Sequence, residues 1–74
     1  MKVRIIANNM TEVETDKSTI LFSYETPVAC CMNDGTGYFK TDCRWSKTTS
    51  KHINKWLDGA TAQEREQAFF NSLA

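Results

Sequence analysis

Hydrophobic and polar residues alternate in the first third of the chain, as they do in strands that bury one face. Within residues 2–7, the apolar Val3 and Ile5 alternate with basic neighbours. Residues 19–24 are β-branched and aromatic, with an apolar or aromatic residue at every second position. Such residues fit a pleated, half-buried surface. We therefore expect one strand at 2–7 and another at 19–24.

The segments on either side of the second strand differ in character. Residues 8–18 are polar, carry three acidic side chains and have no sustained apolar period, so we expect a long connection there. A strand at 27–32, a turn rich in Gly, Asn and Asp, and a strand at 37–41 predict a β-hairpin. Residues 42–45 either extend the sheet or turn away from it, and the pattern fits both.

The last third of the chain predicts two helices, at 49–58 and 62–73. Thr and Ser residues offer N-caps for the first helix, and Gly59 stands where a helix would end. Thr61 and Glu64 have the spacing of a capping box for the second helix. Apolar residues fall on one side of each helix, as expected for helices that pack on a sheet.

The length of the chain limits the fold to one core. The 74 residues include 41% hydrophobic residues, and a chain of this size buries only about 60% of the surface that it exposes when unfolded. We predict a single α+β domain over residues 1–74, with an antiparallel sheet of three to four strands followed by two C-terminal helices. Small domains are often stabilised by a partner, so docking on a larger protein or a homodimer is expected.

The cysteines and the N-terminus favour a cytoplasmic location. Cys30, Cys31 and Cys43 are odd in number and two are adjacent, so they form no disulfide framework of the secreted kind. The apolar run at the N-terminus stops at Asn8, too early for a signal sequence, and no stretch reaches transmembrane length. We expect a protein of a reducing cytosol without contact to a membrane.

The charges are balanced overall and uneven along the chain. Nine basic and nine acidic residues argue against a strongly basic nucleic-acid binder and against an acidic DNA mimic. Residues 12–34 hold five acidic residues and one basic residue, whereas residues 40–55 hold five basic residues and one acidic residue. The molecule is therefore expected to be dipolar.

No pattern in the sequence predicts an active site, a metal site or a cofactor. The cysteines and His52 lack paired zinc-ligand spacing, and Cys30 and Cys31 would point to opposite faces of a strand. His52 with a cysteine has no identifiable third group to orient it. Gly35 and Gly37 fit a hairpin turn better than a phosphate-binding loop. We predict that the protein is not an enzyme.

The basic segment, residues 40–55, is the main candidate for binding. Its lysines and arginine could contact phosphates or a partner protein, with a helix N-terminus and a tryptophan nearby. A solvated helix face explains the same charges. The candidate residues are Lys40, Arg44, Trp45, Lys47, Lys51, His52 and Lys55.

Two runs resemble motifs of a family of small uncharacterised proteins encoded by bacteriophages and mobile elements. Residues 22–29 read F-S-Y-E-T-P-V-A, and residues 48–57 read T-T-S-K-H-I-N-K-W-L. They are similar to the family patterns S-Y-x-T-P-V-A and T-T-S-K-H-I-x-x-W-L. The resemblance covers residues 21–57, about half of the chain. It implies a protein made in an infected or plasmid-bearing bacterial cell, and it implies no activity.

Two functional hypotheses follow. The first is a non-enzymatic interaction protein of phage type that binds a host bacterial protein or complex, as an inhibitor of host defence such as a CRISPR effector complex. The second is a small nucleic-acid-binding module that uses the basic segment, with Trp45 as a stacking group. The first rests on the small size, the missing catalytic pattern and the resemblance.

Overall fold

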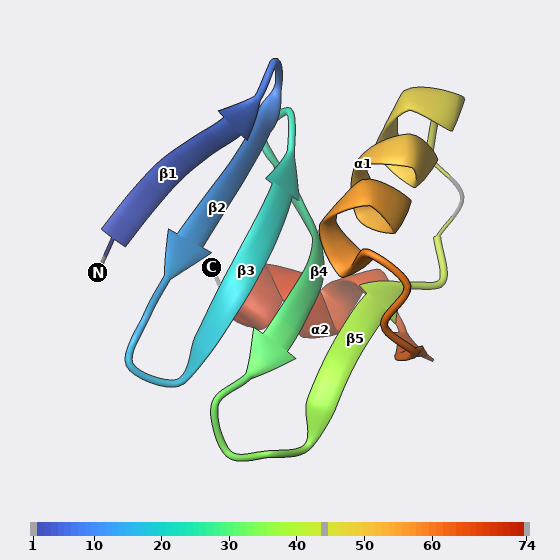
Figure 1. Cartoon of the computed structure of the whole chain (residues 1–74). Helices are drawn as coiled ribbons and strands as arrows, with labels where there is room; N and C mark the ends of the chain where they lie inside the picture. Colours follow the sequence, from blue (N-terminus) through green and yellow to red (C-terminus); the bar gives the residue numbers. More distant parts are fainter. Residues whose placement is uncertain (1, 44, 74) are drawn as a thin grey trace.

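The computed structural model describes residues 2–43 and 45–73. In these residues a mixed sheet of six strands forms the centre of the molecule, and the strands lie side by side in the order of the sequence (Figure 1). Two helices pack against this sheet. The strands are β1 (Lys2–Ala7), β2 (Met10–Glu14), β3 (Ser18–Ser23), β4 (Thr26–Met32), β5 (Gly37–Thr41) and β6 (Ala62–Arg65), and the helices are α1 (Lys47–Leu57) and α2 (Gln67–Leu73).

The first five strands form an antiparallel meander, and the sixth strand is parallel to the fifth. Only two residues separate β1 from β2 and β3 from β4, and in these turns Asn9 and Tyr24 have positive φ values of 60° and 59°. Parallel strands need a long crossover connection. Helix α1 supplies that crossover between β5 and β6.

The two helices bury opposite faces of the sheet (Figure 1). Neighbouring strand residues point to opposite faces, and Leu21 belongs to the core beneath α1 whereas Ile20 belongs to the core beneath α2. Ile53 and Leu57 are the apolar anchors of α1. Phe70 is the fully buried residue of α2. Each face of the sheet therefore has its own small core.

The predicted number of strands was wrong, and so was the purely antiparallel sheet. Residues 8–18, expected to be a long connection, contain β2 and a tight turn at Asn8 and Asn9. The two acidic residues of β2 are unfavourable in strands, so the sequence pattern did not indicate a strand there. Glu12 accepts a hydrogen bond from the Trp56 indole and forms an ion pair with Arg4, so tertiary contacts offset its low strand propensity.

The second helix was predicted too long. Residues 62–65 form β6, and only residues 67–73 are helical, so Thr61 and Glu64 do not form a capping box. The polar sequence of β6 carries no strand pattern of its own. Its pairing with β5, from Tyr38 opposite Ala62 onward, determines its conformation. Non-local pairing has overridden local preference here.

The other elements agree with the predictions within a few residues. The α+β class holds, and the helices lie in the C-terminal part of the chain. The first helix is capped by Ser46, whose side chain accepts a hydrogen bond from the backbone N–H of Thr49, and it ends at Asp58. Strand β5 ends at Thr41, so the described residues between it and α1 lie outside the strands. Neither helix in the described part of the chain is long and apolar enough to cross a membrane.

Candidate functional site

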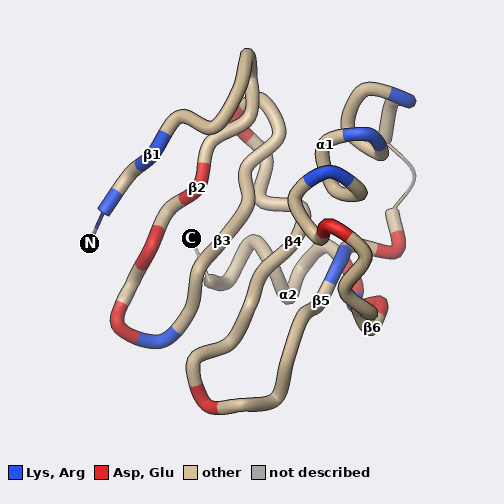
Figure 2. The backbone as a smooth tube through the Cα atoms, in the orientation of Figure 1, with Lys and Arg blue, Asp and Glu red and all other residues tan. Residues whose placement is uncertain are grey.

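Three lysines of the basic segment form a stripe along α1 (Figure 2). Lys47, Lys51 and Lys55 are four residues apart, and all three are exposed. Residues at this spacing lie one above another on a helix surface. The lysine stripe, Lys47–Lys51–Lys55, is therefore a compact basic feature.

Lys40 and Trp45 are outside this stripe. Lys40 is on β5, where its register partner in β6 is Glu64. The Trp45 side chain is 44% exposed, and its indole N–H donates to Oε1 of Gln67 over 3.2 Å. Arg44 lies outside the described residues. Among the predicted residues that the structure describes, only Lys47, Lys51 and Lys55 therefore lie together on one line.

His52 belongs to a polar network that fastens α1 to β3. Its Nδ1 lies 2.8 Å from Oγ of Ser23, and that hydroxyl lies 3.0 Å from Oγ1 of Thr49. Ser23 and Thr49 are buried. Ser23 comes from the first motif of the sequence, and the other two residues come from the second. The contact between the two motifs is thus a structural one.

A serine beside a histidine also raises a catalytic interpretation. Nucleophilic catalysis needs a reachable serine and a third group that orients the histidine. Ser23 is 2% exposed, and no hydrogen bond joins His52 to a carboxylate among the residues described. The arrangement explains packing better than chemistry.

The three cysteines have different environments. Cys30 is buried, Cys31 is half-buried and Cys43 is exposed, and all three are free thiols. Burial, and secondly the neighbouring Cys31, raise the pKa of the Cys30 thiol to about 11. In the described ranges, no three His, Cys, Asp or Glu side chains are grouped as they would be around a metal ion.

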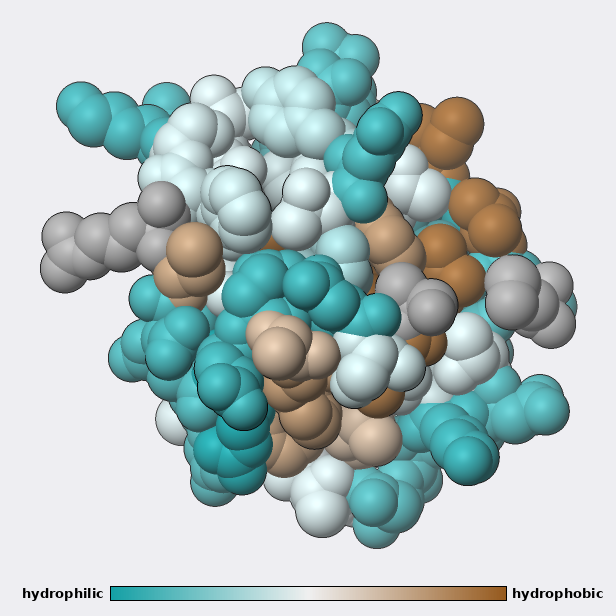
Figure 3. Space-filling view, turned by 180° about the vertical axis from the view of Figure 1, so that it is seen from behind, coloured by the Kyte–Doolittle hydropathy of each residue, from teal (hydrophilic) through white to brown (hydrophobic). Residues whose placement is uncertain are grey.

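An apolar surface that the sequence did not reveal lies on β1, β2 and β3, on the face of the sheet opposite α1. It consists of Val3 and Ile5 of β1, Val13 of β2 and Phe22 of β3, which we call the β1–β3 apolar face. The side chains of Val3 and Ile5 are 63% and 82% exposed. Figure 3 shows hydrophobic side chains gathered on the side where β1 lies.

The geometry of α2 explains why this face is uncovered. Seven helical residues span only about 10 Å, whereas six strands extend across about 24 Å. Along one row of the sheet, Val3 is exposed, Val13 is partly buried, and Ile20 and Cys30 are buried. Burial thus increases toward the strands that α2 covers, and β1 and β2 lie beyond its reach.

The charged side chains of β1 and β2 are all on the opposite face. Glu12 contacts both Arg4, at 3.0 Å, and the Trp56 indole of α1, at 3.0 Å. Lys2 and Glu14 are register partners on that same side. One face of this part of the sheet is therefore charged, and the other is apolar and free of charge.

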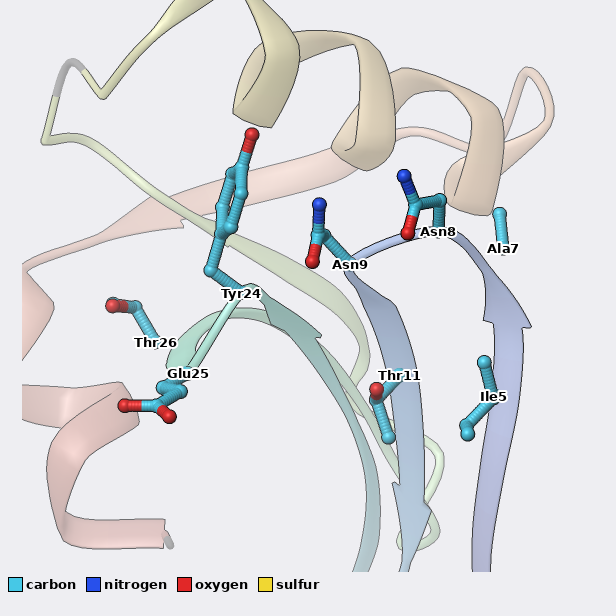
Figure 4. A pocket seen from close by; sticks show the side chains of 8 residues that line it. All are labelled: Ile5, Ala7, Asn8, Asn9, Thr11, Tyr24, Glu25 and Thr26. Atoms are coloured by element: carbon cyan, nitrogen blue, oxygen red, sulfur yellow. The ribbon is translucent and has the colours of Figure 1, made fainter.

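A shallow hollow of about 720 Å³ adjoins the apolar face where two turns meet (Figure 4). The backbone N–H of Tyr24 donates to the carbonyl oxygen of Asn9 over 2.7 Å and joins the turns. Tyr24 is 51% exposed, points toward α1 and lies 6.1 Å from His52 between ring centroids. Ile5 and Thr11 line the hollow, so it is continuous with the apolar strands.

The alternation in residues 2–7 was visible in the sequence, but the exposure of its apolar side chains was not. The pattern predicted a strand with one buried face. Only the length of α2 and the position of β1 at the sheet edge leave Val3 and Ile5 uncovered. An isoleucine that is 82% exposed is a departure from the pattern that could not be read from residue types.

Comparison with known families places the chain in a group. A family of unknown function (DUF8033) matches residues 1–72. The chain belongs to the DUF8033 family. No curated protein and no solved structure matches it. Membership of DUF8033 supplies no activity.

Proposed function

We propose that this DUF8033 protein is a non-enzymatic interaction protein that binds another protein through the β1–β3 apolar face. The observation that carries the proposal is the exposure of Val3 and Ile5 beside Val13 and Phe22 on a face without charged side chains. Exposed apolar patches with polar surroundings mark sites of protein–protein contact. The hollow at the two turns adjoins this face, because Ile5 and Thr11 belong to its lining.

The proposed setting is the cytoplasm of a bacterial host cell. The phage-type motifs of residues 22–29 and 48–57 support this setting by resemblance. In the narrower form of the proposal, the partner is a host defence complex such as a CRISPR effector, which the protein inhibits by occupying its surface. Phage plating on a CRISPR-protected strain, with and without the expressed protein, tests that form. Equal plating efficiencies would count against it.

A comparison of two charge-changing variants tests the binding surface. The wild-type protein is used to capture partners from bacterial lysate, beside Ile5→Lys in the apolar face and Lys51→Glu in the lysine stripe. We expect Ile5→Lys to abolish capture of a specific protein and Lys51→Glu to retain it. The opposite pattern would transfer the binding site to α1, and capture that is unchanged in Ile5→Lys would reject the proposal.

The lysine stripe favours a second candidate, nucleic-acid binding. Three exposed lysines on one line of α1 can contact successive phosphates. Such binding weakens as salt rises, because counterions are released on binding. Titration of labelled DNA and RNA at low and moderate salt, with Lys51→Glu/Lys55→Glu as the comparison, tests it. Equal binding by wild type and the double variant would dismiss this candidate.

A further inference from the structure

The two edges of the sheet differ in how they are protected. Edge strands expose unpaired backbone groups, and natural proteins protect them by shortness and by charge. Strand β6 has four residues, and the exposed ones, Gln63, Glu64 and Arg65, are all polar. Strand β1 has six residues, and Val3, Ile5 and Ile6 are exposed on it. Strand β1 also carries the charged Lys2 and Arg4, so its edge has protection by charge but is longer and more apolar than the β6 edge.

Strand β1 presents a different chemistry on each of its faces. Lys2 and Arg4 point to the α1 side, whereas Val3 and Ile5 point to the apolar side. A strand added beside β1 would place its own side chains directly opposite these residues. Apolar residues of that strand would extend the β1–β3 apolar face, and acidic residues would lie beside Lys2 and Arg4.

A second copy of the chain is a poor match for the same edge. If β1 paired antiparallel with another β1 about Arg4, the two Arg4 side chains would lie opposite each other. If it paired about Val3, Lys2 would face the other Arg4. Like charges directly opposite each other are destabilising. Pairing about Ile5 would cross the irregularity between Ile5 and Ala7 and leave Lys2 without a pairing position.

We propose that the β1 edge binds an extended segment of a partner protein in which acidic residues alternate with apolar ones. The segment joins the sheet as a seventh strand, with its apolar residues beside Val3 and Ile5 and its acidic residues beside Lys2 and Arg4. This inference rests on the proposed function, because it names the partner chemistry at the same surface. Main-chain hydrogen bonds supply affinity in this binding mode, and the alternating side chains supply specificity.

Three synthetic peptides test the inference. One alternates Glu with Val, the second alternates Lys with Val, and the third is the Glu–Val peptide with backbone N-methyl groups that prevent strand pairing. Binding is followed by NMR chemical shifts and by hydrogen exchange of the β1 amides. We expect the Glu–Val peptide to bind on the order of tenfold more tightly than the Lys–Val peptide and to protect β1 amides. The methylated peptide should bind at least as weakly as the Lys–Val peptide.

Charge reversal at the edge is the matched variant. Lys2 is exposed, so Lys2→Glu should leave the fold intact. The substitution should reduce severalfold the preference for the Glu–Val peptide over the Lys–Val peptide. Lys51→Glu reverses the same charge on α1 and should leave the preference unchanged. Equal affinity for the two charged peptides, or undiminished binding of the methylated peptide, would overturn the inference. Protection of the β1 amides in a wild-type dimer without peptide would also overturn the inference.

The outcomes separate this inference from the broader proposal. If a partner is captured through Ile5 but the peptides leave the β1 amides unprotected, the protein binds its partner by the apolar face without strand addition. In that case the proposed function stands and the inference fails. If Ile5→Lys leaves partner capture unchanged, the proposed function itself fails.

Discussion

At the residue scale, the buried thiol of Cys30 links stability to alkaline pH. Its pKa rises from 9.0 to about 11 on folding, so the unfolded chain loses this proton first. As pH rises from 9 to 11, the free energy of unfolding should therefore fall, by about 2–3 kcal/mol from this group at most. Urea denaturation across this range, monitored by circular dichroism, measures the slope.

Two alanine variants separate Cys30 from the other groups that titrate in the same range. Cys30→Ala should lower stability at neutral pH, because it leaves a small cavity, but flatten the decline above pH 9. Cys43→Ala, at an exposed thiol, should keep the wild-type slope. Equal slopes in wild type and Cys30→Ala would contradict the prediction.

The hydroxyl of Ser23 is a second residue whose effect is local and measurable. It lies within hydrogen-bond distance of both Thr49 and His52, and it is almost fully buried. Ser23→Ala should lower the free energy of unfolding by about 1–2 kcal/mol, because both partners lose a buried contact. Chemical denaturation checks this against Ser50→Ala, an exposed serine of α1, for which a change below about 0.5 kcal/mol is expected.

At the scale of single elements, the C-terminal end of α1 is not optimal for stability. Asp58 terminates the helix with φ 49°, in the left-handed region, and places a negative charge at the helix C-terminus. Both features cost free energy. Asp58→Gly should therefore raise the free energy of unfolding by about 1 kcal/mol, measured by thermal and urea denaturation.

Asp58→Ala is the control for the backbone effect. Alanine removes the charge but retains a Cβ atom in the left-handed region, so it should stabilise less than glycine. If the two variants are equally stable, the charge and not the backbone conformation explains the gain.

At the scale of the whole molecule, the β1–β3 apolar face should contribute to association and not to stability. Ile5 is 82% exposed, so Ile5→Lys should change the free energy of unfolding by less than about 0.5 kcal/mol. It should also lower the fluorescence of a hydrophobic dye, because it puts a charge into the apolar face. Urea denaturation and dye titration measure these effects.

Phe70→Ala is the contrasting variant on the same side of the sheet. Phe70 of α2 is fully buried against the sheet, so its truncation should cost about 3–5 kcal/mol. A similar loss in Ile5→Lys would show that Ile5 supports the fold and would contradict its assignment to a free surface.

The elements that were predicted correctly are those whose pattern is local. Residues 2–7 and 37–41 are strands in the sequence pattern and in the structure, and the first helix is amphipathic in both. Strands β2 and β6 are polar, and their pairing depends on neighbours that the local pattern does not contain. The basic segment was read as one candidate site, yet chain geometry places only its three helical lysines on a common line.

The sequence by itself determined the α+β class, four of the strands and the position of the first helix, because hydrophobic period and capping act over a few residues. Only the tertiary structure decided which strand residues are covered. The span of α2 is shorter than the width of the sheet, and this leaves Val3 and Ile5 exposed at an edge. Burial depends on the distance between elements, and no residue type records that distance.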